Sequence, residues 1–560
     1  MSMIAPINVR FILLILMSNK HYQEDSPEND RTIKRQKETP VSTSVDIELS
    51  IEQVKKKCVE FENQIEVRWN EFEAYLSQLP TTVFNQTFIG DDSEQTLLMY
   101  FIEINCSPGI SFVLAQNGID VNIIQPSSGF TALHMVCDKG EIDLVILEKL
   151  LENGANPNLF SNSNVTPLYL ILVAEEFQFT HFQAVQLLTT KYKAELNAEP
   201  TCIDRAYVSG NCLSVLSDRK NFRGAFILQT VQFLIENGAI VNFKNTKSQR
   251  TPLMQCFIRN SSCLHVPEYI ELLIRNHVDL DTQDGTGNTA LHWACGRTFH
   301  SLSLIELLLT KGANPNLFNT YNETPLYMML VKSDFKLDDL EALRLLVRNK
   351  VELNKESSNV NQAYVDGNCL HVLGKRTHFD SPHLLTAIQF VIDSGANVNF
   401  LNQTSTETPL MRACFQSSND SAIQYVQLLI QNKANLDVTD VDDDTALDML
   451  YRSNDNNPEI AKLLIRNGAN CIETYRRYTF FPNYQMQMLA ILIDEIFAQE
   501  PDETKRKQIL FYNPKIDAAQ TKLVQLLQYY ATRTNQQNLI QSMVSANGSN
   551  ALQALVLTYL

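Results

Sequence analysis

One short pattern recurs along this chain and limits what it can fold into. Each copy opens with Thr-Ala/Pro-Leu, runs through a helical stretch and a second helix ending in Leu-Leu, and closes on Gly-Ala-Asn-x-Asn. The clearest copies open at Thr131 and Thr289. A unit of this size cannot bury its own apolar faces, so neighbouring units must stack. The pattern therefore predicts a solenoid, not a single globular core.

The residue types of the pattern follow from the physics of a helix pair. A Thr caps the first helix, and a Pro in its first turn costs no hydrogen bond. Leu133 and Leu291 fall on the inward face. Gly154 and Gly312 supply the positive φ that ends the second helix, and the Asn residues after them suit a turn.

About ten units can be counted. The first and the last are degenerate, because residues 96–99 (Thr-Leu-Leu-Met) lack the Pro and residues 445–448 (Thr-Ala-Leu-Asp) lack a His. Terminal units are expected to differ, since they cap the stack against water. The openings lie at Thr96, Thr131, Thr166, Asn211, Thr251, Thr289, Thr324, Asn368, Thr408 and Thr445.

These residues resemble the ankyrin signature, in which a Thr-Pro-Leu-His-x-Ala opening starts a helix–turn–helix unit of about 33 residues. Residues 131–134 and 289–292, both Thr-Ala-Leu-His, carry the resemblance most fully, and it extends over about 93–473. It implies an all-α fold: an ankyrin-repeat solenoid of helix–turn–helix units with short β-hairpins, and helical N- and C-terminal extensions. It also implies a concave groove of hairpins and first helices that binds a partner protein.

A longer repeat contains several copies of the short one. The sequence Ala-Asn-Pro-Asn-Leu-Phe occurs at residues 155–160 and again 158 residues later. We interpret this as the duplication of a whole four-unit block, at about 129–287 and 287–444.

Each block also holds an insertion with the sequence Ala-Tyr-Val, whose tyrosines are Tyr207 and Tyr364. These insertions kept their residues while the segments 218–227 and 375–384 diverged. We therefore expect both tyrosines to be buried in equivalent pockets. A recent duplication, in which the copies have not yet drifted, is the alternative.

The ends of the chain depart from the pattern. Residues 1–45 are expected to form a disordered tail, because most of this segment is polar and charged. Residues 46–92 are expected to form a helical N-terminal cap, since apolar residues recur there at steps of three and four. Residues 474–560 read as a C-terminal helical module of no recognised family.

Composition and net charge limit which kinds of partner and which cellular compartment we expect for this protein. A net charge of −17 repels phosphates and disfavours nucleic acid as the main partner. The eleven cysteines are odd in number and form no Cys-x-x-Cys pair, which favours reduced thiols in the cytoplasm or nucleus. No apolar stretch is long enough to span a membrane.

Two N-terminal segments bear on localisation. Residues 11–17 are apolar but short for a signal peptide and lack a cleavage site, so Met17 is an alternative start to Met1. Residues 31–37 hold four basic residues, which leaves nuclear import open. We expect a cytoplasmic protein, with the nucleus as the open alternative and secretion only for an effector.

Side chains that could carry chemistry have structural interpretations. We expect His134, His292 and His371 to hydrogen-bond the neighbouring hairpin, as the resemblance implies. Cys137, Cys295 and Cys414 should lie in the core, because Cys is small and readily buried, and Trp293 should pack under the stack. We therefore predict no catalytic residue, no cofactor and no metal ion.

The acidic run Asp440-x-Asp442-x-Asp444 invites a calcium interpretation. However, Thr445 and Tyr451 stand where an EF-hand loop needs Gly and Glu. We expect the tip of a hairpin that favours a basic partner region.

The predicted function is a protein-binding scaffold or adaptor, a monomer and not an enzyme. An effector of an intracellular bacterium and an enzyme with its activity in 474–560 are the alternatives. The expected partner contacts are positions beside the motif and the acidic run: Phe130, Asp138, Lys139, Asn288, Arg297, Thr298, Asp440, Asp442, Asp443 and Asp444.

Overall fold

The computed structural model describes most of the repeat region. The predictions for the tail 1–45, for the helices expected after residue 478, and for Tyr207 and Tyr364 lie outside the described residues. These are 53–54, 56–57, 69–89, 94–199, 210–217, 225–259, 266–296, 302–332, 334–356, 367–374, 381–415, 421–452 and 457–478.

A helix begins one residue after each of the ten predicted openings. These first helices are α4 (Leu97–Glu103), α6 (Ala132–Cys137), α8 (Pro167–Val173), α10 (Cys212–Ser217), α12 (Pro252–Arg259), α14 (Ala290–Gly296), α16 (Pro325–Leu330), α18 (Cys369–Gly374), α20 (Pro409–Phe415) and α22 (Ala446–Arg452).

A second helix follows each first helix. The second helices are α5 (Ser107–Leu114), α7 (Leu144–Glu152), α9 (Phe179–Thr190), α11 (Ala225–Glu236), α13 (Val266–Arg275), α15 (Leu302–Thr310), α17 (Leu337–Arg348), α19 (Pro382–Asp393), α21 (Ser421–Gln431) and α23 (Pro458–Arg466).

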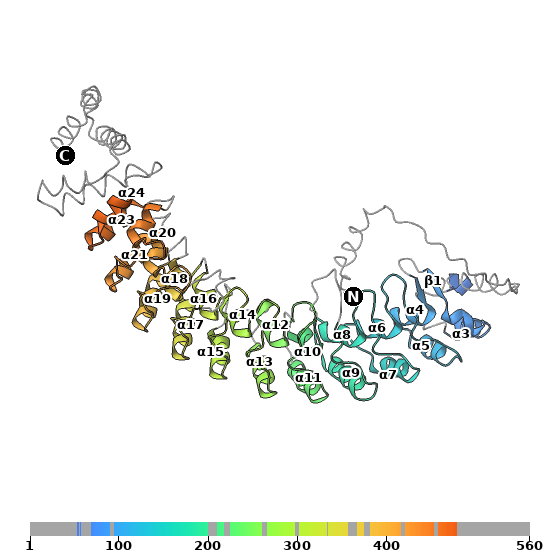
Figure 1. Cartoon of the computed structure of the whole chain (residues 1–560). Helices are drawn as coiled ribbons and strands as arrows, with labels where there is room; N and C mark the ends of the chain where they lie inside the picture. The colour runs from blue at the N-terminus through green and yellow to red at the C-terminus, as the bar shows by residue number, and fades with distance from the viewer. Residues whose placement is uncertain are drawn as a thin grey trace, which may run out of the picture. The chain divides into compact units, whose positions relative to one another are not determined.

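The helix pairs stack in sequence order, as Figure 1 shows. Every first helix contacts the first helix of the next pair, and every second helix contacts the next second helix. A further helix, α24 (Cys471–Tyr478), packs on α22 and continues the row of first helices. The predicted all-helical solenoid is confirmed. Within the described residues, no helix combines the length and the apolar character that a membrane span needs.

Local sequence explains how the first helices begin. The Thr131 and Thr324 hydroxyls accept hydrogen bonds from the third backbone N–H of α6 and α16, at 3.4 and 3.3 Å. Leu133 and Leu291 are fully buried, which confirms the inward face.

The Asn residues that the sequence assigns to turns also join neighbouring units. The side-chain amide of Asn122 donates to the Gly154 carbonyl at 3.0 Å, and its Oδ1 accepts from the Asn156 N–H at 2.7 Å. Asp281 lacks the amide donor and keeps only the accepting half of this bridge. The full bridge recurs at Asn85, Asn158, Asn197, Asn242, Asn316, Asn354 and Asn399.

The N-terminal cap differs from the expected run of helix. Helix α3 (Trp69–Leu76) is followed by the 3-10 helix η1 (Thr81–Asn85) and strand β1 (Thr87–Ile89), which pairs antiparallel with β2 (Glu94–Thr96). Pro80 follows the end of α3 and disfavours a longer α-helix, and β-branched Thr87 and Ile89 suit the strand β1. Among the described residues, β1 and β2 form the only sheet.

Helix α3 covers the first helix pair, as a cap should. The Trp69 ring meets the Phe101 and Phe112 rings edge to face, with centroids 5.9 and 6.1 Å apart. Phe72 packs on Phe101 in the same manner at 6.1 Å and is fully buried. This aromatic cluster shields the end of the stack from water.

Candidate functional site

The turns between successive helix pairs form hairpin-like loops, which we call fingers. Each finger that the structure describes is closed by a backbone hydrogen bond from its first residue to its last, although none of these described fingers forms strands. With the first helices they make up the finger face, where a partner is expected. The described fingers are 125–130, 161–165, 245–250, 284–288, 319–323, 402–407 and 440–444.

Three consecutive fingers are joined to one another. The Gly285 N–H donates to the Ser248 carbonyl at 2.9 Å, and the Thr320 N–H donates to the Thr286 carbonyl at 3.0 Å. We call residues 245–250, 284–288 and 319–323 the central finger plate. Because each finger is tied to the next, the plate presents its side chains on a fixed support.

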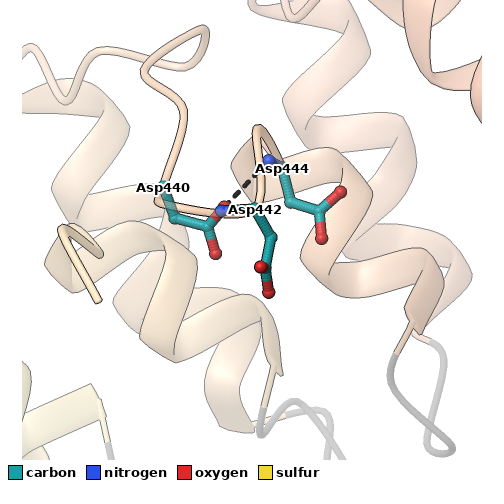
Figure 2. Close-up of side chains that lie close together, drawn as sticks. All are labelled: Asp440, Asp442 and Asp444. Atoms are coloured by element: carbon teal, nitrogen blue, oxygen red, sulfur yellow. Dashed lines mark hydrogen bonds between the residues drawn. The ribbon is translucent and has the colours of Figure 1, made fainter. Parts of the chain in front are cut away.

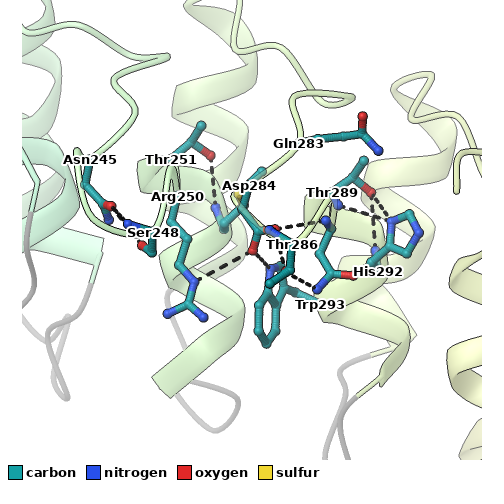
Figure 3. Close-up of polar contacts among 12 residues, drawn as sticks. Asn245, Ser248, Arg250, Thr251, Gln283, Asp284, Thr286, Thr289, His292 and Trp293 are labelled. Carbon is teal, nitrogen blue, oxygen red and sulfur yellow. Dashed lines mark hydrogen bonds and ion pairs between the residues drawn. The ribbon is translucent and has the colours of Figure 1, made fainter. Parts of the chain in front are cut away.

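Asp284 organises the middle finger of this plate, as Figure 3 shows. Its Oδ1 accepts the backbone N–H groups of Thr286 and Asn288, both at 2.9 Å. Its Oδ2 accepts the indole N–H of Trp293 at 3.0 Å. One buried carboxylate therefore folds the finger and fixes a Trp of α14.

Arg250 reaches the same group from the preceding finger. Its guanidinium carbon lies 4.8 Å from the centroid of the Trp293 ring, and its Nε lies 3.8 Å from Asp284 Oδ2. The arginine thus compensates the carboxylate and makes a cation–π contact at once. Its side chain is 30% exposed and the Trp is half-buried. The expectation that Trp293 packs under the stack is therefore wrong, because its ring lies at the finger face beneath Arg250.

The histidines at the fourth position of the motif are structural. His292 Nδ1 accepts the Thr289 N–H at 3.1 Å, and its Nε2 lies 3.1 Å from the Glu323 carbonyl, to which it donates. His134 and His371 make the same two contacts. Burial lowers the pKa of His292 to about 4, so the ring is neutral near pH 7. The predicted hydrogen bond to the neighbouring finger is confirmed.

The cysteines offer no reactive thiol in the described part of the chain. Cys137, Cys295 and Cys414 are buried in the core, as predicted. Burial raises the pKa of the Cys295 thiol to about 12 and that of Cys137 and Cys414 further still. A thiol with such a pKa is not a nucleophile at neutral pH. Eight cysteines are described; all of them are buried, and none of these eight forms a disulfide.

The acidic finger 440–444 brings three carboxylates together, as Figure 2 shows. One oxygen from each of Asp440, Asp442 and Asp444 lies within 4.8 Å of the others. Asp440 Oδ1 is occupied by the N–H groups of Asp442 and Asp444, both at 2.9 Å. Arg452 bonds Asp444 Oδ2 and lies 3.5 Å from Asp442 Oδ2. The cluster thus shapes a finger and is compensated by an arginine, so we assign no metal to it.

Comparison with known proteins agrees with this geometry. The family model described as "Ankyrin repeats (3 copies)" matches residues 262–357 and 380–474, and the model "Ankyrin repeat" matches residues 128–162. The chain is an ankyrin-repeat protein.

Curated relatives share these ankyrin repeats over part of their length. The human B-cell lymphoma 3 protein is 28% identical over 243 residues, which is 38% of this chain and 49% of that protein. Ankyrin repeat protein B18 of variola virus is 22% identical over 381 residues, 62% of each chain. The chain spans about half the length of the B-cell lymphoma 3 proteins it matches.

Solved structures include the crystal structure of the ankyrin repeat domain of Bcl-3. It is 23% identical, with a TM-score of 0.34, and covers 45% of this chain and all of that one. Ankyrin repeats generally mediate protein–protein interaction.

The residues predicted to contact a partner differ in how far their side chains are exposed to solvent. Asp138, Asp442 and Asp443 are exposed. Phe130 is half-buried and stacks on the ring of His134. Lys139 is half-buried, with its Nζ bonded to the Ile102 carbonyl and to Asn105 Oδ1. Arg297 and Thr298 lie outside the described residues.

Three of the predicted contacts are buried, which corrects their interpretation as surface positions. Asn288 is 6% exposed, because its amide donates to Thr286 Oγ1 and its Oδ1 accepts from the Asn319 amide, at 2.9 and 3.0 Å. Asp440 and Asp444 are buried by their bonds within the acidic finger. These side chains build the fingers and do not present a surface.

Sequence reasoning missed Arg250 and the role of Asp284. Arg250 lies 43 residues before Trp293, and no local pattern marks the pair. The nearest signal is the Asp at the start of the finger, which recurs as Asp440, although the arginine beside that finger, Arg452, bonds Asp444 and not Asp440.

Proposed function

We propose that this protein is a scaffold that holds a partner protein against the central finger plate, around Arg250 and Trp293. The observation that carries this proposal is the Arg250–Trp293 pair, fixed by Asp284 on joined fingers. Trp, Tyr and Arg are the residue types that most often dominate the binding energy of protein interfaces.

A third side chain of this kind lies in the same plate. Tyr321 belongs to the finger hydrogen-bonded to the middle one and is 46% exposed. An amphipathic ring held on an ordered loop gives contact area at a small entropic cost. The three side chains therefore form a compact, preorganised surface for a protein partner in the cytoplasm or nucleus.

The proposal is tested by affinity capture from cell extract with the full chain and three single variants. Trp293→Ala and Arg250→Ala should each weaken the captured complex at least about tenfold, because hot-spot truncations cost roughly 2 kcal/mol. Arg452→Ala is the matched control, since it removes an arginine of α22 that pairs with the equivalent acidic finger. Tm values measured alongside separate lost binding from lost folding.

A partner that binds all folded variants with equal affinity contradicts the proposal. A partner lost only with Arg452→Ala would move the site to the acidic finger 440–444.

A further inference from the structure

The second helices carry a groove on a face that the fingers do not occupy. It lies along α9, α11 and α13, which neighbour one another in Figure 1. Its volume is about 610 Å³. Sequence patterns give no reason to expect it, because the second helices of such units normally need only an inward apolar face.

The floor of this groove is apolar. Phe182 of α9 and Phe233 of α11 meet edge to face, with ring centroids 6.0 Å apart, and both are half-buried. Leu272 of α13 lines the same floor. Phe179 and Phe226, 5.2 Å apart, add a second aromatic pair on the same two helices, and Phe179 is 49% exposed. Aromatic surface left open in this way marks an interaction site.

The rim of the groove is acidic. Glu236 and Glu268 are exposed at its edge, and Glu271 lies beside them. Arg275 is the one basic residue among those lining the groove, and it lies 3.3 Å from Glu271. An excess of negative charge therefore surrounds an apolar floor.

The second block supplies a natural comparison. Tyr269 and Tyr425 are both fully buried and donate to the carbonyls of Leu213 and Leu370, which fixes the register of α13 against α21. In this register, three charged positions of α13 become glutamines in α21. Glu268, Glu271 and Arg275 correspond to Gln424, Gln427 and Gln431.

The floor differs between the blocks as well. Phe390 of α19 corresponds to Phe233, and the guanidinium of Arg344 lies over it at 4.9 Å. The residue of the first block that corresponds to Arg344 is Gln186. The second block therefore covers its aromatic ring with a cation of its own, whereas in the first block Phe233 lines the groove beside the acidic rim.

We propose that this groove, which we call the outer groove, binds a basic amphipathic helix of a partner protein. Apolar side chains of the helix fill the floor, and flanking Lys or Arg residues meet Glu236 and Glu268. A helix laid into a groove between helices satisfies its own backbone hydrogen bonds, which an apolar floor requires. The charge pattern excludes acidic helices by repulsion. This site is separate from the central finger plate and does not depend on it.

The test uses two labelled synthetic peptides of about five helical turns, roughly 18 residues. Both present Leu on one face; one carries Lys at the flanking positions and the other carries Glu. Fluorescence anisotropy with the full chain should show binding of the Lys peptide and at least about tenfold weaker binding of the Glu peptide.

Two variants carry the residues of the second block into the first. Glu268→Gln with Glu271→Gln removes the acidic rim, and Gln186→Arg sets a cation over Phe233. Each should weaken the Lys peptide about tenfold, since each removes or opposes roughly 1.4 kcal/mol of charge interaction. The control, Glu306→Gln with Glu341→Gln, removes two exposed acids from α15 and α17 and should leave binding unchanged.

Several results overturn the proposal. These are equal binding of the two peptides, no binding of the Lys peptide, or an equal loss in the control and the rim variant. Hydrogen exchange gives an independent readout: the Lys peptide should protect α11 and α13, and protection confined to the central finger plate would also refute the outer groove.

Discussion

The two four-unit blocks, which we interpret as copies of one another, begin one pair of corresponding helices differently. In the first turn of both α9 and α17, one side chain accepts a hydrogen bond from the backbone N–H of the residue three positions before it. In the first block His181 Nδ1 accepts from Gln178 at 3.2 Å, and in the second Asp339 Oδ2 accepts from Lys336 at 2.8 Å. The hydrogen bond is kept although the residue that makes it has changed.

The carboxylate brings a cost that the imidazole does not. Asp339 is buried, and a buried charge needs a partner. Lys332 provides it at 2.8 Å, with side chains only 5% and 3% exposed, where the first block has Ala174. The comparison shows that both blocks keep the hydrogen bond to the backbone N–H. Where the second block makes this bond with a charged residue, it also holds a residue of opposite charge beside it.

The largest change in stability is expected when the ion pair between Lys332 and Asp339 is broken. Lys332→Met leaves Asp339 buried without its cation and should lower the free energy of unfolding by about 3 to 5 kcal/mol. Denaturant titration of the full chain measures it. The double variant Lys332→Ala with Asp339→His recreates the first-block pair and should recover most of the loss. An equally unstable double variant would show that the two blocks are not interchangeable here.

The next effect tests whether the inward faces are equivalent. Leu133→Ala and Leu291→Ala each remove a fully buried side chain and should each cost about 2 to 5 kcal/mol. Thermal melts of both variants give the comparison. An unchanged Tm for either one would mean that its helix face is assigned wrongly.

The pH dependence of stability follows from His292. Its pKa is about 4 in the folded protein and about 6.5 in the unfolded chain, so the unfolded state binds more protons between these values. The contribution is complete above pH 6.5 and is lost as the pH falls towards 4, by about 3 kcal/mol in all. Denaturation midpoints at pH 7.5 and 5 measure it. His292→Gln should reduce the dependence, and an unchanged slope would contradict this account.

The smallest effect concerns the buried tyrosine hydroxyls that set the register of the blocks. Tyr269→Phe and Tyr425→Phe leave the carbonyls of Leu213 and Leu370 without this donor, and each should cost about 1 to 3 kcal/mol. Matching losses in urea titrations support equivalent packing, whereas a loss in only one variant would separate the blocks.

Local signals in the sequence were enough to locate the helices. The Thr caps, the Leu at the third position and the Gly after the second helix act within one unit, so each opening could be read without knowing its neighbours. The cap was predicted less well, because the β1–β2 pair forms only where residues 87–89 meet residues 94–96. The surface was predicted least well, as the burial of Asn288 shows.

The sequence by itself determined the repeat, its register and its inward face, since capping and the 3.6-residue period are local properties. The tertiary structure decided which side chains lie inside a finger and which lie on it. Asn122 looks like a turn residue until the next unit brings the Gly154 carbonyl within 3.0 Å. Arg250 and Trp293 come together only because stacking sets one finger beside the next. Contacts between units depend on the distance and rotation from one helix pair to the next, and no single unit encodes these.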